Sequence, residues 1–180
     1  QRVLAEAIQE LKEEAFAKEF KEEMNAQEHR WAVDCQIDTD LPLLLPETYV
    51  DSMAERLALY KELDSLQQDH EIPAFESRLR DRFGPLPAPA TDLLLALKLR
   101  LKAQSLGIER IVFKNGQLQA GFPGQERAAY YSSGLFSRIL AKIGNRRDVE
   151  MRQQKTRLVL HFNGVKTMTD ALGVVEELMA

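Results

Sequence analysis

The segment Gly-Pro-Leu-Pro-Ala-Pro at residues 84–89 constrains the fold of this chain more than any other feature. Glycine just past the last helical residue favours the left-handed conformation that ends a helix. Proline lacks the backbone N–H that a helix interior needs. One helix must therefore end at Gly84, and the next must begin near Pro89.

Helices are predicted on both sides of this break. Residues 72–83 carry Phe75, Leu79 and Phe83 at i, i+4 spacing, which predicts one buried stripe. Residues 89–106 carry leucine almost all round the helix at their start, a pattern typical of the most buried helix of a domain.

A further helix is predicted over residues 52–66, because Ser52 and Glu55 have the spacing of a capping box. A polar break follows it at residues 67–70. The residues predicted to face inward on this helix are Met53, Leu57, Tyr60 and Leu63.

Two β-hairpins are predicted after Gly107, each followed by a helix. Asn115-Gly116 is the strongest hairpin signal in the chain, because both residue types tolerate positive φ. The predicted elements are strands 108–113 and 117–122, a helix over 125–143, strands 149–152 and 156–162, and a helix over 168–179. The last helix is expected to bury Met168, Leu172, Val175 and Met179.

The N-terminal part is predicted to be a charged helix over residues 3–27 and a strand over 31–38, with Cys35 as an inert core residue. This helix could pack on its own domain or connect to another one. We therefore expect a lead-in at residues 1–40 and an α+β domain at residues 41–180. That domain would combine a three-helix segment with an antiparallel sheet on which helices pack.

The charge is unevenly distributed along the chain, which has 24 basic and 28 acidic residues. Residues 98–157 hold thirteen basic and four acidic residues, a net charge of +9, whereas residues 1–30 have a net charge of −3. A basic region attracts phosphate backbones or acidic protein surfaces, and the sequence does not separate the two. The possible nucleic-acid-binding residues are Arg146, Arg147, Arg152, Lys155 and Arg157. No aromatic residues are interleaved with them for base stacking, which favours a solvated face.

No catalytic, metal or cofactor motif is present. The chain lacks a phosphate-binding loop, a dinucleotide fingerprint, a zinc-protease motif and EF-hand spacing, and its three histidines are scattered. We expect no catalytic residues, no metal and no cofactor. The sequence has a single cysteine, no apolar run of roughly 20 residues and no pattern typical of a signal peptide. We therefore expect a cytoplasmic location without a membrane partner.

The helix over residues 72–83 offers the most specific surface for a partner. On a helical wheel Arg78, Asp81 and Arg82 lie beside the buried stripe, as charged residues do at the rim of an interface. Pairing within the helix, such as Arg78 with Asp81, is an equally good interpretation.

The run Asp81-Arg-Phe-Gly-Pro-Leu-Pro87 resembles the C-terminal domain of bacterial transcription-repair coupling factors. The resemblance extends through essentially the whole chain. Its other matching segments are Leu45-Pro46, Tyr49-Val50, Arg56-Leu57, Tyr60-Lys61 and Leu106-Gly107-Ile108. Residues 1–12 also resemble the helix that leads from the motor of that family into this domain.

The resemblance implies a noncatalytic regulatory domain within an ATP-dependent, Mg-using DNA translocase that acts on stalled RNA polymerase and recruits UvrA. In that family the domain docks on an N-terminal UvrB-like module and masks the UvrA-binding surface. The resemblance places this contact on the helix that ends in the motif. Asp81 and Arg82 match the motif, while Arg78 stands where some relatives carry an acidic residue. The alternative from the residues alone is a nucleic-acid-binding module that uses residues 98–157.

Overall fold

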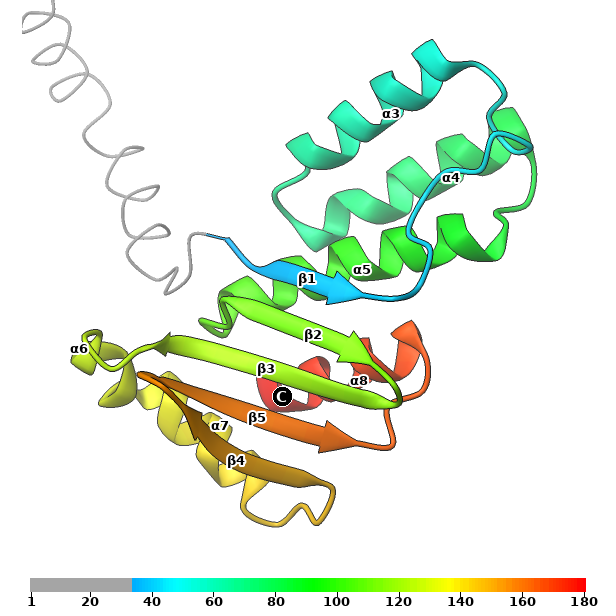
Figure 1. The fold of residues 1–180 in the computed structure, drawn as a ribbon. Helices are drawn as coiled ribbons and strands as arrows, with labels where there is room; N and C mark the ends of the chain where they lie inside the picture. Colours follow the sequence, from blue (N-terminus) through cyan, green and yellow to red (C-terminus); the bar gives the residue numbers. More distant parts are fainter. Residues whose placement is uncertain (1–33) are drawn as a thin grey trace, which may run out of the picture.

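The computed structural model describes residues 34–180, as an α+β fold with a five-stranded sheet (Figure 1). The helix predicted over residues 3–27 lies outside these residues, as do Trp31 and Val33 of the predicted strand. The elements are β1 (Gln36–Thr39), α3 (Met53–Ser65), the 3₁₀ helix η1 (Asp69–Glu71), α4 (Ile72–Phe83), α5 (Ala88–Ser105), β2 (Arg110–Lys114), β3 (Gln117–Gly124), α6 (Ala128–Tyr131), α7 (Gly134–Ile143), β4 (Val149–Gln154), β5 (Arg157–Asn163) and α8 (Met168–Met179).

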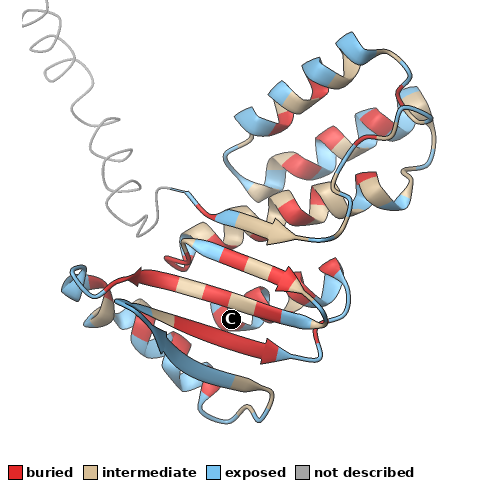
Figure 2. Cartoon of the chain, viewed as in Figure 1, coloured by how far each residue is buried: buried red, intermediate tan, exposed pale blue. Residues whose placement is uncertain are grey.

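Helix α5 connects two hydrophobic clusters, and this confirms its predicted central position. Ala90 and Leu94 near its start pack with α3 and α4, whereas Leu99 and Ala103 further along pack under the sheet. Helices α5, α7 and α8 lie on one face of the sheet, and the face toward the viewer carries no described helix (Figure 1). Buried residues accordingly mark the inner sides of the helices and strands β2, β3 and β5 (Figure 2).

The sheet has the strand order β1-β2-β3-β5-β4. The two predicted hairpins, β2-β3 and β4-β5, are confirmed as antiparallel pairs and pair with each other through β3 and β5. Strand β1 adds to this antiparallel sheet a parallel edge, paired with β2, which the sequence did not predict. Asn115 and Gly116 both have positive φ, 54° and 70°, as the predicted tight turn requires. In the second hairpin the turn is at Lys155 and Thr156, with φ of 55° at Lys155, so β4 runs two residues beyond its predicted end and β5 begins and ends one residue later than predicted.

The prediction of one helix over residues 125–143 is wrong in one respect, because this segment forms two helices. Helix α6 ends at Tyr131 and α7 begins at Gly134. Ser133 is the N-cap of α7, and its side chain accepts a hydrogen bond from the backbone N–H of Phe136 at 3.3 Å. A serine before an apolar run caps a helix more readily than it continues one, and this local preference decides the break.

The inward face predicted for the helix over residues 52–66 is also wrong in part. Leu63 is buried as expected, and Ser52 caps the helix by accepting from Glu55 N–H. Met53 and Leu57, however, are 69% and 56% exposed, and Leu59 takes the buried place. Helix α3 carries leucines on two faces, and α4 and α5 cover one of them. At the C-terminus Met179, predicted to be buried, is likewise exposed.

Candidate partner-binding surface on helices α3 and α4

Helix α4, which has the predicted bounds, is fixed at its C-terminal end by the loop before α3. Phe75 and Leu79 bury its inner face, and Phe83 is partly buried. The ring of Tyr49 meets the Phe83 ring edge-on, with 5.8 Å between centroids. The Tyr49 hydroxyl lies 2.8 Å from the carbonyl oxygen of Gly84 and 3.2 Å from that of Leu79. The position of the last turn of α4 is thereby set by contacts outside the helix.

The two arginines of the predicted partner-binding set are ion-paired with helix α3. Arg82 Nη2 lies 2.8 Å from Glu55 Oε1, and Arg78 pairs with Glu62 one turn earlier on α4. The pairing of Arg78 with Asp81, which the sequence left open, is not formed among the described residues. The charges instead link α3 to α4, two helices that run in opposite directions.

Both arginines also cover aromatic rings of α4. The guanidinium carbon of Arg78 lies 5.5 Å from the centroid of Phe75, and that of Arg82 lies 4.8 Å from the centroid of Phe83. Such contacts hold a guanidinium over an apolar surface without removing it from water. The side chains remain 60% and 56% exposed.

A hollow of about 150 Å³ lies between the two helices at this place. Its floor is apolar, from Leu59, Phe75 and Leu79, and its rim carries the charged residues. Asp81 is exposed and forms no ion pair with a described residue. Among the described residues, this surface therefore presents a carboxylate without an ion pair beside two arginines that are each paired with a glutamate of α3.

The sequence pattern predicts the arginines of this surface but not the glutamates that pair with them. Glu55 has the spacing of a capping partner, and Glu62 belongs to no local motif. The signal was present as acidic residues seven apart on one helix and basic residues four apart on the next. It becomes visible once the two helices are known to be antiparallel neighbours.

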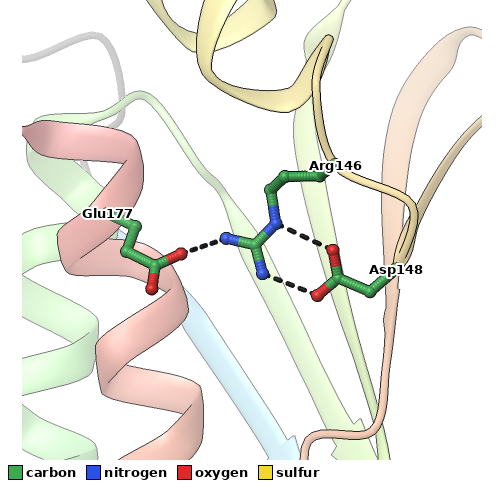
Figure 3. A network of polar contacts seen from close by, with 3 residues as sticks. All are labelled: Arg146, Asp148 and Glu177. Atoms are coloured by element: carbon green, nitrogen blue, oxygen red, sulfur yellow. Dashed lines mark hydrogen bonds and ion pairs between the residues drawn. The ribbon is translucent and has the colours of Figure 1, made fainter.

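The predicted nucleic-acid-binding residues do not form one free basic patch. Arg146 donates to both oxygens of Asp148, at 2.9 and 2.6 Å, and pairs with Glu177 of α8 (Figure 3). The Asp148 hydrogen bonds raise the pKa of Arg146 above its usual value. The Arg146 guanidinium also lies 5.4 Å from the ring of Phe162. These contacts give Arg146 a structural role between the sheet and α8.

The remaining members of this set differ in their surroundings. Arg152 pairs with Glu150 at 2.6 Å, and Arg157 pairs with Glu109 at 3.2 Å. Arg147 and Lys155 form no ion pair with a described residue. Three of the five basic residues are thus neutralised by carboxylates of the same domain.

The described residues hold no group of three or more histidine, cysteine, aspartate or glutamate side chains that could bind a metal. Cys35 is 1% exposed, which confirms its predicted place in the core. Burial, with a smaller contribution from Asp34, raises the pKa of its thiol to about 12, so the thiol is protonated at neutral pH. Within residues 34–180 no helix has the length and apolarity that crossing a membrane requires.

Comparison with known proteins gives consistent matches. A family model described as the TRCF domain matches residues 39–133. The transcription-repair-coupling factor of Escherichia coli (strain K12) is 37% identical over 76 residues, which is 42% of this chain and 7% of that protein. That of Rickettsia typhi is 33% identical over 107 residues, which is 59% of this chain and 9% of that protein. The chain therefore spans less than a tenth of the length of these relatives.

The fold, with its charged helical pair beside a sheet, defines an α+β domain like the one in a crystal structure of the C-terminal domain of transcription-repair coupling factor. That structure superposes with a TM-score of 0.68 at 16% identity, over 81% of this chain and 92% of the other. Because the TRCF domain model covers more than half of the residues, the chain belongs to the TRCF domain family.

Proposed function

We propose that this chain is a noncatalytic regulatory and interaction domain of a transcription-coupled DNA repair translocase in the bacterial cytoplasm. It docks through α4 on an N-terminal UvrB-like module of the same protein and masks the surface that UvrA binds. ATP and Mg are used by the motor of that longer protein, and RNA polymerase and DNA are reached through it. Membership of the TRCF domain family supports this proposal.

The observation that carries the proposal is the ordered charged rim of α4. Arg78 and Arg82 are held by Glu62 and Glu55, and the neighbouring Asp81 forms no ion pair with a described residue. Fixing these side chains before docking lowers the entropy lost on association. A partner surface with matching charges would find the rim already arranged.

A contact of this kind can be weak and still keep the longer protein closed. Two modules of one chain meet at an effective concentration of about millimolar. Separating the two modules then costs only a modest free energy of binding, as a regulatory contact that has to open requires.

A binding titration against the isolated N-terminal UvrB-like module of the same protein tests the proposal. We expect saturable binding that weakens by about tenfold or more in the double variant Asp81→Arg/Arg82→Glu, since both charges at the interface are reversed. Far-UV circular dichroism and urea unfolding verify that the variant is folded. Unchanged affinity in a folded variant would show that α4 is not the docking surface.

A charge swap separates docking from the internal ion pair. Glu55→Arg/Arg82→Glu retains a pair between α3 and α4 but places the negative charge on α4. If the partner contacts the charged group of Arg82 directly, the swap variant binds as poorly as Arg82→Glu alone. Recovery of full affinity in the swap would mean that Arg82 acts through the α3–α4 geometry and not by touching the partner.

The alternative, a nucleic-acid-binding module that uses residues 98–157, is tested in the same assay with duplex and single-stranded DNA. It predicts an affinity that decreases steeply with salt. No DNA binding at low salt, together with saturable docking on the UvrB-like module, excludes it.

A further inference from the structure

A second surface, distant in the fold from the α3–α4 pair, lies at the edge of the sheet formed by β4. The strand order places β4 last, with β5 on one side and no described strand on the other. All six of its residues are exposed or partly exposed (Figure 2). An edge of this length presents backbone groups on which another strand can pair.

Beside this edge is an apolar groove of about 270 Å³ between α7 and the sheet. Leu140 of α7 and Met151 of β4 both line it, and they are 38% and 46% exposed. The groove is lined by Gln125, Tyr131, Phe136, Leu140, Met151, Gln153 and Leu158. Two large apolar side chains from different elements thus leave an opening in which further apolar side chains would be buried.

The hydrogen bonds of β4 show which backbone groups are available. Asn163 N–H donates to the carbonyl of Asp148 at 2.9 Å, one step beyond the pair Val149 and Phe162. In an antiparallel ladder the bonded pairs alternate. Even-numbered residues of β4 therefore bond to β5, and the N–H and C=O of Met151 and Gln153 point toward the free edge.

The backbone groups at the free edge belong to the same residues that line the groove. Met151 and Gln153 contribute their side chains to the groove and their backbone to the open edge. In an added antiparallel strand, the residues opposite them would project their side chains to the same face, toward Leu140 and Phe136. One extended segment can therefore satisfy the strand edge and fill the groove together.

The charge of this region selects the partner. Residues 134–157 hold seven basic and two acidic residues, a net charge of +5, and Glu177 and Glu109 from outside this segment pair with Arg146 and Arg157. Both acidic residues, Asp148 and Glu150, are ion-paired with neighbouring arginines. Four basic side chains form no ion pair with a described residue, namely Arg138, Lys142, Arg147 and Lys155. An acidic partner is attracted, whereas two copies of this edge would repel each other.

We propose that the β4 edge and its groove bind an extended acidic segment of a partner protein. The segment adds as an antiparallel strand to β4, with alternate apolar side chains in the groove and acidic ones on the other face. The strand edge beside the groove favours a peptide over a nucleic acid, because only a peptide backbone can continue the hydrogen-bond ladder of β4.

The test is a fluorescence anisotropy titration of the full chain with a short capped peptide in which Glu and Ile alternate. A peptide of the same composition, with Glu and Ile in separate blocks, is the control for charge alone. We expect saturable binding of the alternating peptide and binding about tenfold weaker or more for the block peptide. Equal binding of the two peptides would overturn strand addition.

Two variants and one matched control locate the site. Leu140→Asp puts a negative charge in the groove, and Met151→Pro removes a backbone N–H that β5 does not use. Each variant is expected to bind the alternating peptide about tenfold more weakly, or weaker still. Leu57→Asp makes a similar change at an exposed leucine of α3 and should leave binding unchanged. If Met151→Pro does not fold, Leu140→Asp carries the test, because Leu140 is already partly in solvent.

Three further results would overturn the proposal. The first is that folded groove variants bind the peptide as tightly as the unaltered chain does. The second is that these variants lose affinity for duplex DNA but not for the peptide. The third is sedimentation showing that the chain self-associates through this edge, because the occupant would then be a second copy.

Discussion

The hydroxyl of Tyr49 donates a hydrogen bond to the carbonyl of Gly84, 2.8 Å away and 35 residues later in the chain. The bond joins the loop before α3 to the residue that ends α4. Because the C-terminal carbonyls of a helix lack partners within the helix, a side-chain donor at this place stabilises the last turn. That turn carries Asp81 and Arg82, so the bond also helps to hold the proposed docking surface.

Tyr49→Phe is expected to destabilise the domain by about 1 kcal/mol, the usual net contribution of one hydrogen bond. The ring contact with Phe83 is retained in this variant, so the loss reports the hydroxyl alone. Urea unfolding followed by circular dichroism measures it. A midpoint that does not change would show that water replaces the hydroxyl at the Gly84 carbonyl without cost.

Alanine at two glycines should have opposite effects on stability. Gly84 has φ of 86° and ψ of −166°, a region that side chains avoid, although a Cβ there would meet no atom within 4 Å. Gly84→Ala should therefore cost about 1–3 kcal/mol from backbone strain alone. Gly173 lies inside α8, also without an atom within 4 Å of a Cβ, and Gly173→Ala should stabilise the domain by about 0.5–1 kcal/mol.

Thermal unfolding of the two alanine variants gives the comparison directly. The same atom is added in both, and neither site is crowded, so the difference between them isolates backbone conformation. Destabilisation at both positions would mean that the added methyl group, and not φ, decides the outcome.

Local rules predicted the elements whose ends are fixed by short segments. The C-terminal end of α4 followed from Gly84 and the prolines after it, and the first hairpin from Asn115-Gly116. The break before α7 was missed because helical periodicity continues across Ser133. In this place capping competes with periodicity, and capping prevails.

Features that depend on distant parts of the chain could not be predicted in this way. The parallel pairing of β1 with β2 joins residues 74 apart, such as Gln36 and Arg110, and no local pattern specifies it. The buried face of α3 depended on where α4 and α5 lie. For the same reason the charged rim of α4 was predicted, but its ion pairs to α3 were not.

The free energy of unfolding should decrease as the pH is lowered, because His161 on β5 is only 6% exposed and resists protonation in the folded state. Burial lowers its pKa below the usual 6.5, with Arg152 acting in the same direction and Glu150 against it. A lowered pKa means that the unfolded chain binds the proton more readily, so the stabilisation is complete above 6.5 and is lost as pH decreases toward the folded value.

His161→Gln should remove this dependence while it retains a polar side chain near Gln154, whose Nε2 lies 3.4 Å from His161 Nε2. We expect the difference in unfolding free energy between about pH 7 and pH 5 to become smaller in the variant. Urea unfolding at the two pH values measures it. An equal difference in both proteins would assign the acid sensitivity to other groups.

Arg146 gives the last prediction, because its neighbour Arg147 provides a matched control. A lysine at 146 cannot reproduce the two parallel bonds to Asp148 together with the contact to Glu177 (Figure 3). We expect Arg146→Lys to destabilise the domain by about 1 kcal/mol, discounted for the partial exposure of Asp148 and Glu177. Arg147→Lys should be neutral, since Arg147 is exposed and forms no ion pair with a described residue.

Acid titration shows whether the effect of Arg146 is electrostatic. Hydrogen bonds from Arg146 hold the pKa of Asp148 below its usual 3.8, so this stabilisation is present above 3.8 and is lost as pH decreases below it. The destabilisation in Arg146→Lys should therefore shrink in acid. If it stays constant down to the protonation of Asp148, the loss comes from the packing of the guanidinium on Phe162 and α8, and the ion pair contributes little.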